Sequence, residues 1–120
     1  MRPTEKELAI LKILWDRGPS TVRTVHNALG DGDQLAYTTS LKVLQIMHDK
    51  GLVSREKEGK THLYKAQVSE RRTQDQLVDK LMDTAFRGSA TNMVLQLLDR
   101  GNYSEKELEE IRNYLGKLGK

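Results

Sequence analysis

A stripe of short polar side chains is the part of this sequence best suited to chemistry. Its members recur at i, i+4, i+7 and i+11, the spacing of one helical face: Thr38, Lys42, Gln45 and Asp49. Thr39 lies beside the stripe near its start. Hydroxyls and a cation at the opening of an exposed helical face can hydrogen-bond to DNA base edges and phosphates. We therefore expect Thr38, Thr39 and Lys42 to make such contacts.

The stripe belongs to a helix predicted over residues 35–50, which follows a polar loop at 31–34 and ends at Gly51. The other side of this helix is expected to be buried, with Tyr37, Ser40, Val43, Leu44 and Met47 facing inward. Tyr37 is expected to pack there while its hydroxyl reaches a phosphate. We include Tyr37 and Ser40 among the candidate DNA-binding residues.

A basic β-hairpin is predicted directly after this helix. Two β-prone runs, 52–57 and 60–66, flank a turn that contains Gly59. Positive side chains gather near its tip, namely Arg55, Lys57 and Lys60, together with His62. These three cations are expected to clamp a DNA backbone. The alternative is a solvated hairpin whose lysines only maintain solubility; the helices that precede it favour the first interpretation.

Two further helices are predicted upstream. A capping box of Thr4 and Glu7 begins the first helix, which ends at Gly18. The second helix ends at Gly30, and Thr21 near its N-terminus is a further candidate for holding the DNA backbone. Three helices followed by a hairpin are the layout of a winged helix-turn-helix. We assign residues 1–68 to such a DNA-binding domain, in a mainly α protein.

Residues 69–120 are predicted to form a helical dimerisation domain. Apolar residues recur along stretches 69–86 and 89–100, and a second capping box, Ser104 with Glu107, begins a final helix. About 50 residues are too few to bury these side chains alone. A second copy is therefore expected to cover them: Leu77, Leu81, Met93, Leu97, Leu108, Ile111 and Leu115. The alternative is that these helices pack back onto the first domain as one globule.

Composition and charge narrow the function further. The 120 residues are 37% hydrophobic and 31% charged, as in a folded, helix-rich protein. Residues 1–68 hold 11 Lys and Arg against 8 Asp and Glu, whereas residues 69–120 hold 9 of each. All the excess positive charge therefore lies in the half expected to meet DNA, although an excess of three is modest.

Several function classes are excluded. Without cysteine there are no disulfides, thiolate zinc sites or cysteine nucleophiles. His26, His48 and His62 come from three elements without metal-ligand spacing, and no glycine-rich loop could cradle a phosphate. We expect no enzymatic activity, metal or cofactor. The absence of a bilayer-spanning apolar run and of a signal peptide near Met1 predicts a cytoplasmic protein.

The main alternative function is a winged-helix protein-interaction module that does not bind DNA. An interaction helix would be expected to present apolar anchors on its exposed face. Only Ile46 is apolar on the corresponding face of the predicted helix. The polar exposed face therefore favours DNA binding over a protein-interaction module.

Several short motifs occur together along this chain: Ala36-Tyr37-Thr38-Thr39, Leu44, Lys50-Gly51-Leu52, Leu14-Trp15 upstream and Tyr64 in the second hairpin strand. With these motifs the chain resembles the penicillinase-repressor (BlaI/MecI-type) family of transcriptional regulators over nearly its whole length. The resemblance implies a dimeric winged-helix repressor of β-lactamase-type or other resistance or stress genes. It also implies a palindromic operator of double-stranded DNA, whose two half-sites match the two-fold symmetry of a homodimer.

The chain also departs from the family pattern. The resemblance implies a membrane sensor protease as partner, which cuts between asparagine and phenylalanine; the matching place here is Gln96-Leu97. The family usually has valine, threonine and arginine where this chain has Ser40, Lys42 and Ile46, so a different operator sequence is expected. Copper-responsive relatives carry a C-terminal cysteine motif, and its absence excludes a thiolate copper sensor.

Overall fold

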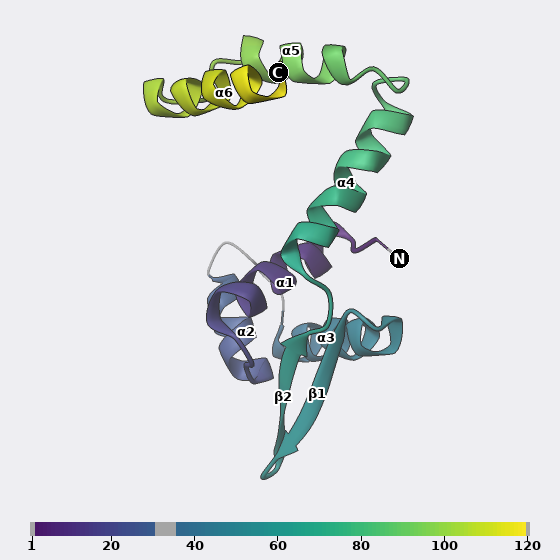
Figure 1. The fold of residues 1–120 in the computed structure, drawn as a ribbon. Helices are drawn as coiled ribbons and strands as arrows, with labels where there is room; N and C mark the ends of the chain where they lie inside the picture. Colours follow the sequence, from purple (N-terminus) through teal and green to yellow (C-terminus); the bar gives the residue numbers. More distant parts are fainter. Residues whose placement is uncertain (1, 31–35, 120) are drawn as a thin grey trace. The chain divides into compact units, whose positions relative to one another are not determined.

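The computed structural model describes residues 2–30 and 36–119. The predicted polar loop at 31–34 and Leu35, the predicted first residue of the third helix, lie outside the described residues. The elements run in the following order (Figure 1): α1 (Glu5–Arg17), α2 (Val22–Leu29), α3 (Tyr37–Lys50), β1 (Val53–Glu58), β2 (Thr61–Ala66), α4 (Glu70–Thr84), α5 (Ala90–Asp99) and α6 (Glu105–Leu118). Three helices, a two-stranded hairpin and three more helices confirm the predicted mainly helical, winged fold.

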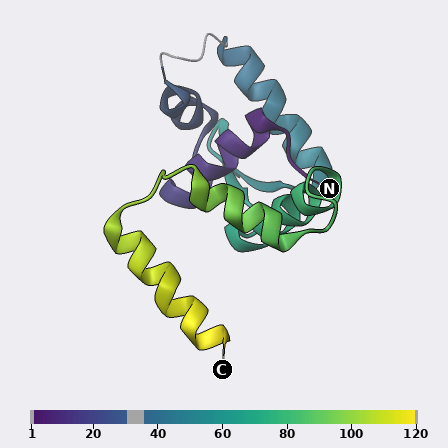
Figure 2. The same cartoon turned by 90° about the horizontal axis from the view of Figure 1, so that it is seen from above.

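The chain divides into two compact units, residues 1–78 and 79–120, and the division falls within α4. The first unit contains the three N-terminal helices and the hairpin. Figure 2 shows α1, α2 and α3 from above, and each of these three helices contacts the other two. None of the described helices in either unit is both long and apolar enough to cross a membrane.

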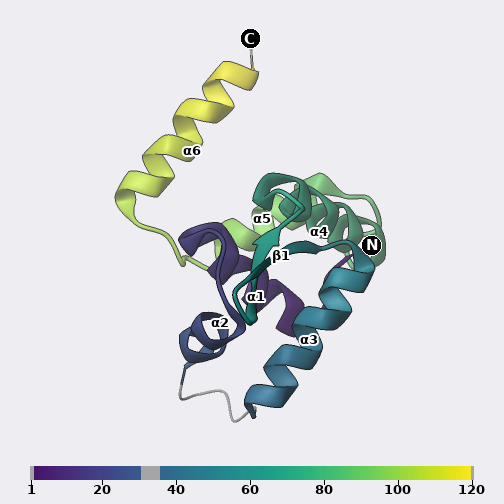
Figure 3. The same ribbon diagram turned by 90° about the horizontal axis from the view of Figure 1, so that it is seen from below.

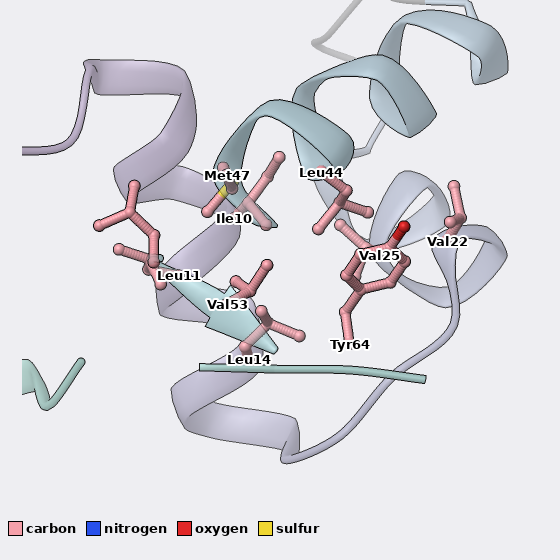
Figure 4. Packing of buried hydrophobic residues seen from close by; sticks show 10 residues of the cluster. Ile10, Leu11, Leu14, Val22, Val25, Leu44, Met47, Val53 and Tyr64 are labelled. Atoms are coloured by element: carbon pink, nitrogen blue, oxygen red, sulfur yellow. The ribbon is translucent and has the colours of Figure 1, made fainter. Parts of the chain in front are cut away.

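The core of the first unit draws on all three helices and both strands. Figure 4 shows these side chains pointing toward one another. The buried set is Ile10, Leu11, Leu14, Val22, Val25, Leu44, Met47, Leu52, Val53 and Tyr64. Tyr64 also joins Ser20 through two backbone hydrogen bonds of 2.8 and 2.9 Å, which tie the second strand to the segment before α2. The hairpin base is thereby fixed to the helices.

Local hydrogen bonds explain where the helices begin and end. The capping box of α1 is present: Thr4 Oγ1 accepts from the Glu7 amide at 3.2 Å, and Glu7 accepts from the Thr4 amide at 2.9 Å. Gly51 ends α3 at φ 83°, a left-handed conformation that glycine adopts without steric cost. The chain can therefore turn directly from α3 into β1.

The hairpin pairs in antiparallel register, with Arg55 opposite Tyr64 and Lys57 opposite His62. It extends beyond the three helices as a ribbon, which is seen from the side in Figure 1 and from below in Figure 3. We call this hairpin, residues 53–66, the wing.

The second unit has no core of its own among its described residues. Every described residue from 79 to 119 is at least partly exposed. The predicted capping box of α6 is confirmed, since Ser104 and Glu107 exchange hydrogen bonds of 3.0 and 3.1 Å. The helices are thus well defined locally, while their apolar side chains stay open to solvent.

Candidate nucleic-acid interface

The two predicted faces of α3 are present in the structure. Its outward face is exposed and mostly polar: Thr38, Thr39, Lys42, Gln45 and Asp49, with Ile46 as the apolar exception. Its inward face packs into the core through Leu44 and Met47. The helix thus presents hydroxyl, amide and ammonium groups to solvent along its length.

Ser40 is a correction to the predicted DNA contacts. Its side chain is fully buried, and its hydroxyl lies 2.8 Å from Nδ1 of His26 on α2. Two residues along a helix correspond to slightly more than half a turn, so Ser40 points away from the face that carries Thr38. Ser40 therefore links α3 to α2, and its buried side chain is not available to DNA in this structure.

Tyr37 begins α3 and contacts two residues of α2. The guanidinium carbon of Arg23 lies 4.1 Å from the centre of the Tyr37 ring. The His26 ring meets the same tyrosine edge-on, at 5.7 Å between ring centroids. Sequence reasoning did not select Arg23; the available signal was a basic residue in the first turn of α2, just after Thr21.

Thr21 is the N-cap of α2 and is half-buried. Its hydroxyl accepts from the Thr24 amide and lies 3.2 Å from the Thr24 hydroxyl. Because that hydroxyl is engaged within the cap, Thr21 can serve DNA mainly by presenting the start of α2.

The wing separates its charges by face. Directly paired residues in an antiparallel hairpin share a face, so Arg55 and Lys57 lie on the same side as Tyr64 and His62. Glu56 and Glu58 lie on the opposite side, with Lys65 nearer the body of the unit. Arg55, Lys57 and Lys60 are all exposed. In the described part of the chain, no carboxylate is within ion-pairing distance of these three cations.

A buried ion pair fixes the far end of α3. Lys50 Nζ lies 2.7 Å from Glu7 Oε2, and the Glu7 residue is only 4% exposed. Burial alone would raise the pKa of Glu7, but the hydrogen bonds from Lys50 and from Thr4, with the Lys50 charge, lower the pKa below its ordinary value. The carboxylate therefore stays charged and ties α1 to α3.

The predicted dimerisation residues of the second unit line two apolar hollows. Leu81, Met93 and Leu97 surround one of about 260 Å³, together with Phe86. Ile111 and Leu115 line another of about 410 Å³, together with Tyr114, which was not in the predicted set. Leu108 is half-buried, as is Leu77 of the first unit.

Comparison with known proteins shows the family. The family model for the penicillinase repressor matches residues 3–117. The transcriptional regulator BlaI of Mycobacterium tuberculosis is 36% identical over 118 residues, a match that covers 93% of this chain and 81% of the relative. The chain belongs to the penicillinase-repressor family. The methicillin resistance regulatory protein MecI of Staphylococcus aureus is 21% identical over 111 residues, covering 92% of this chain and 90% of the relative.

Solved structures share the fold of this chain. A MarR family protein from Bacillus stearothermophilus superposes with a TM-score of 0.53 at 19% identity, covering 99% of this chain and 74% of the other. The PcaV transcriptional regulator of Streptomyces coelicolor superposes with a TM-score of 0.54 at 16% identity, and the match covers 98% of this chain and 75% of the other. At these identities the likeness concerns the fold alone.

Membership of this family makes the chain a DNA-binding transcriptional regulator and not an enzyme. The resemblance inferred from the Ala36-to-Thr39 motif is confirmed. The departures from the family pattern separate into two kinds. Lys42 and Ile46 are exposed on α3, whereas Ser40 is buried against His26. The expected difference in operator sequence therefore rests on Lys42 and Ile46.

Proposed function

We propose that this repressor acts as a homodimer that reads a palindromic operator, with α3 of each subunit in the major groove of one half-site. The observation that carries the proposal is the exposed polar face of α3, which is followed directly by a wing with a cationic face. The proposed targets are β-lactamase-type or other resistance or stress genes, with the repressor acting in the cytoplasm.

In this proposal, Thr38, Thr39 and Lys42 contact base edges and the nearest phosphates. A lysine can donate to O6 and N7 of guanine, and a threonine can donate to an acceptor or pack its methyl group on thymine. No carboxylate in the described residues is within ion-pairing distance of Lys42, so its ammonium is available to DNA.

The wing is proposed to bind the phosphate backbone beside the groove. Arg55 and Lys57 lie on one face of the hairpin, and Lys60 lies in its turn. Contacts to phosphates carry no sequence information directly, but they set the register of the protein on the duplex. The wing would thus contribute affinity, while α3 contributes discrimination.

The second unit is proposed to form the homodimer interface. Leu97 is 59% exposed and Leu115 is 53% exposed, and no described residue from 79 to 119 is buried. A monomer would leave this apolar surface in water, at a cost of about 25 cal/mol per Å². A two-fold dimer covers both copies with the same surface, and its symmetry matches half-sites about one helical turn of DNA apart or a multiple of it.

Release by a sensor protease is the proposed route of induction. The matching bond, Gln96–Leu97, lies within α5 and both of its residues are exposed. Cleavage there would detach α6 and the end of α5, which carry Leu97, Leu108, Ile111 and Leu115. The cut would therefore remove much of the proposed dimer surface and, with it, paired binding to the two half-sites.

The proposal is tested by selecting bound fragments from a random DNA pool. A palindrome with two half-sites is expected among the enriched fragments. A pool that yields no palindrome after repeated selection would contradict the dimeric reading mechanism.

Lys42→Ala and Lys60→Ala are expected to have different effects on DNA binding. Lys42→Ala should weaken binding to the selected operator by about 1–3 kcal/mol and affect random DNA much less. Lys60→Ala should weaken binding to operator DNA and to random DNA, and it should reduce the salt dependence of the affinity, because it removes a phosphate contact. Fluorescence titration at two salt concentrations measures both quantities. Equal losses for the two variants on both DNAs would contradict the assigned roles.

A further inference from the structure

We propose that Arg23 is a DNA-phosphate-binding residue and that Tyr37 is the positioning residue that holds it ready. The proposal rests on the DNA-binding function and adds a contact on α2 to those of α3 and the wing. The ligand is the phosphodiester group of the DNA backbone beside the start of α3.

A chain of side-chain contacts leads from the core to the surface at Arg23. Buried Ser40 contacts Nδ1 of His26 at 2.8 Å, and the ring of His26 meets Tyr37 edge-on. Tyr37 in turn lies under the exposed guanidinium of Arg23, 4.1 Å from its ring centre. Arg23 and His26 are three residues apart on α2, as Tyr37 and Ser40 are on α3, so each pair shares one helical face. The two faces together fix the tyrosine ring.

Stacking on the ring prepares the arginine for a ligand. A free arginine loses side-chain conformational entropy when it is held in one geometry. The Tyr37 ring restricts that motion in advance, and cation–π contact leaves the N–H groups at the edge of the guanidinium plane able to donate.

No partner for those N–H groups lies within the described chain. Among residues 2–30 and 36–119, no carboxylate is within ion-pairing distance of Arg23, and the Arg23 side chain makes no hydrogen bond. A planar, always charged fork matches a phosphate, which it can bind through two parallel hydrogen bonds.

The position of Arg23 is also suited to this role. Tyr37 is the first residue of α3, so the arginine lies at the end of α3 that carries Thr38 and Thr39, which are proposed to read the bases. A phosphate held at this place would fix how far α3 enters the groove and which bases the two threonines meet.

The first test compares Arg23→Ala with Lys12→Ala, which removes an exposed cation from α1. Arg23→Ala is expected to lower affinity for operator and random DNA alike, by about tenfold per half-site. The slope of log affinity against log salt should fall in magnitude by about 0.9 for each Arg23 that contacts a phosphate. Lys12→Ala should change the DNA affinity and the salt slope much less than Arg23→Ala does.

The results separate the inference from the proposed function. An Arg23→Ala variant that behaves like Lys12→Ala, while the wild type still selects a palindrome, would overturn the inference alone. A loss confined to operator DNA would also overturn it, because that result indicates a base contact. Failure of the wild type to bind any DNA would instead overturn the proposed function.

A second test isolates the role of Tyr37, with each variant first checked for an unchanged fold by circular dichroism and thermal melting. Tyr37→Phe keeps the ring and should retain the wild-type salt slope. Tyr37→Leu removes the ring but no charge, and it should reduce the slope in the same direction as Arg23→Ala. If Tyr37→Phe has the same effect as Tyr37→Leu, the hydroxyl is responsible and the positioning role is wrong. A Tyr37→Leu variant with the wild-type slope would equally contradict that role.

Discussion

Replacing both Leu97 and Leu115 with lysine is expected to give a monomer that no longer binds its operator at working concentrations. The two leucines are exposed on α5 and α6, and four introduced charges would meet in a homodimer. A dimer that contacts both half-sites binds about 10²- to 10⁴-fold more tightly than a subunit that contacts one half-site, and a monomer loses this gain in affinity. Sedimentation equilibrium gives the oligomeric state, and titration with operator DNA gives the affinity.

A double variant of polar residues provides the matched control for this experiment. Asn92 and Asn113 are exposed on the same two helices, so Asn92→Lys with Asn113→Lys adds the same charge outside the predicted dimerisation set. This control should remain dimeric and bind the operator. The leucine variant should also keep the melting transition of the first unit, since the core there is formed by other residues. A dimeric leucine variant with full operator affinity would rule out the proposed interface.

Lys50→Met is expected to lower the free energy of unfolding by about 2–3 kcal/mol at neutral pH. The substitution leaves the buried carboxylate of Glu7 without its 2.7 Å partner, although the hydrogen bond from the Thr4 amide remains. The expected loss of stability is smaller than for a fully buried pair because the Lys50 side chain is 27% exposed and partly screened by solvent. Urea denaturation measures the change, and Lys12→Met, at an exposed position on α1, should cost less than about 0.5 kcal/mol.

The same pair predicts a dependence of stability on acid pH. The pKa of Glu7 is lower in the folded protein than its ordinary value of 4.5. Its contribution to stability is therefore complete above 4.5 and is lost as pH falls from there through the folded pKa. Glu7→Gln cannot ionise, so the stability difference from wild type should shrink on acidification. A difference that stays constant across this window would show that the Glu7 charge does not stabilise the fold.

The features that the sequence predicted well are those that depend on neighbouring residues. A capping box such as Thr4 with Glu7 spans one helical turn, and the glycine that ends α3 acts on its own residue and the turn before it. The alternation of polar and apolar residues likewise identified the exposed and buried sides of α3. Such patterns can be recognised from residue type and spacing alone.

The features that the sequence did not reveal join residues from different elements. Lys50 and Glu7 are separated by 43 positions, and His26 and Ser40 by 14. The helical spacing placed Ser40 on the inward face of α3, but nothing in the local pattern showed that its hydroxyl contacts a histidine on the adjacent helix. The same reason kept Arg23 from being selected, because its contact is with a ring on α3. The dimer contacts stay a prediction, since they need a second chain.

The charge separation on the wing has a consequence for the direction in which the protein meets DNA. A groove lined by phosphates attracts the face with Arg55 and Lys57 and repels the face with Glu56 and Glu58. A subunit that approached with the wing turned over would bring two carboxylates against the backbone. If the wing binds the DNA backbone as proposed, this arrangement of charges favours one orientation of α3 on a half-site over the reverse orientation.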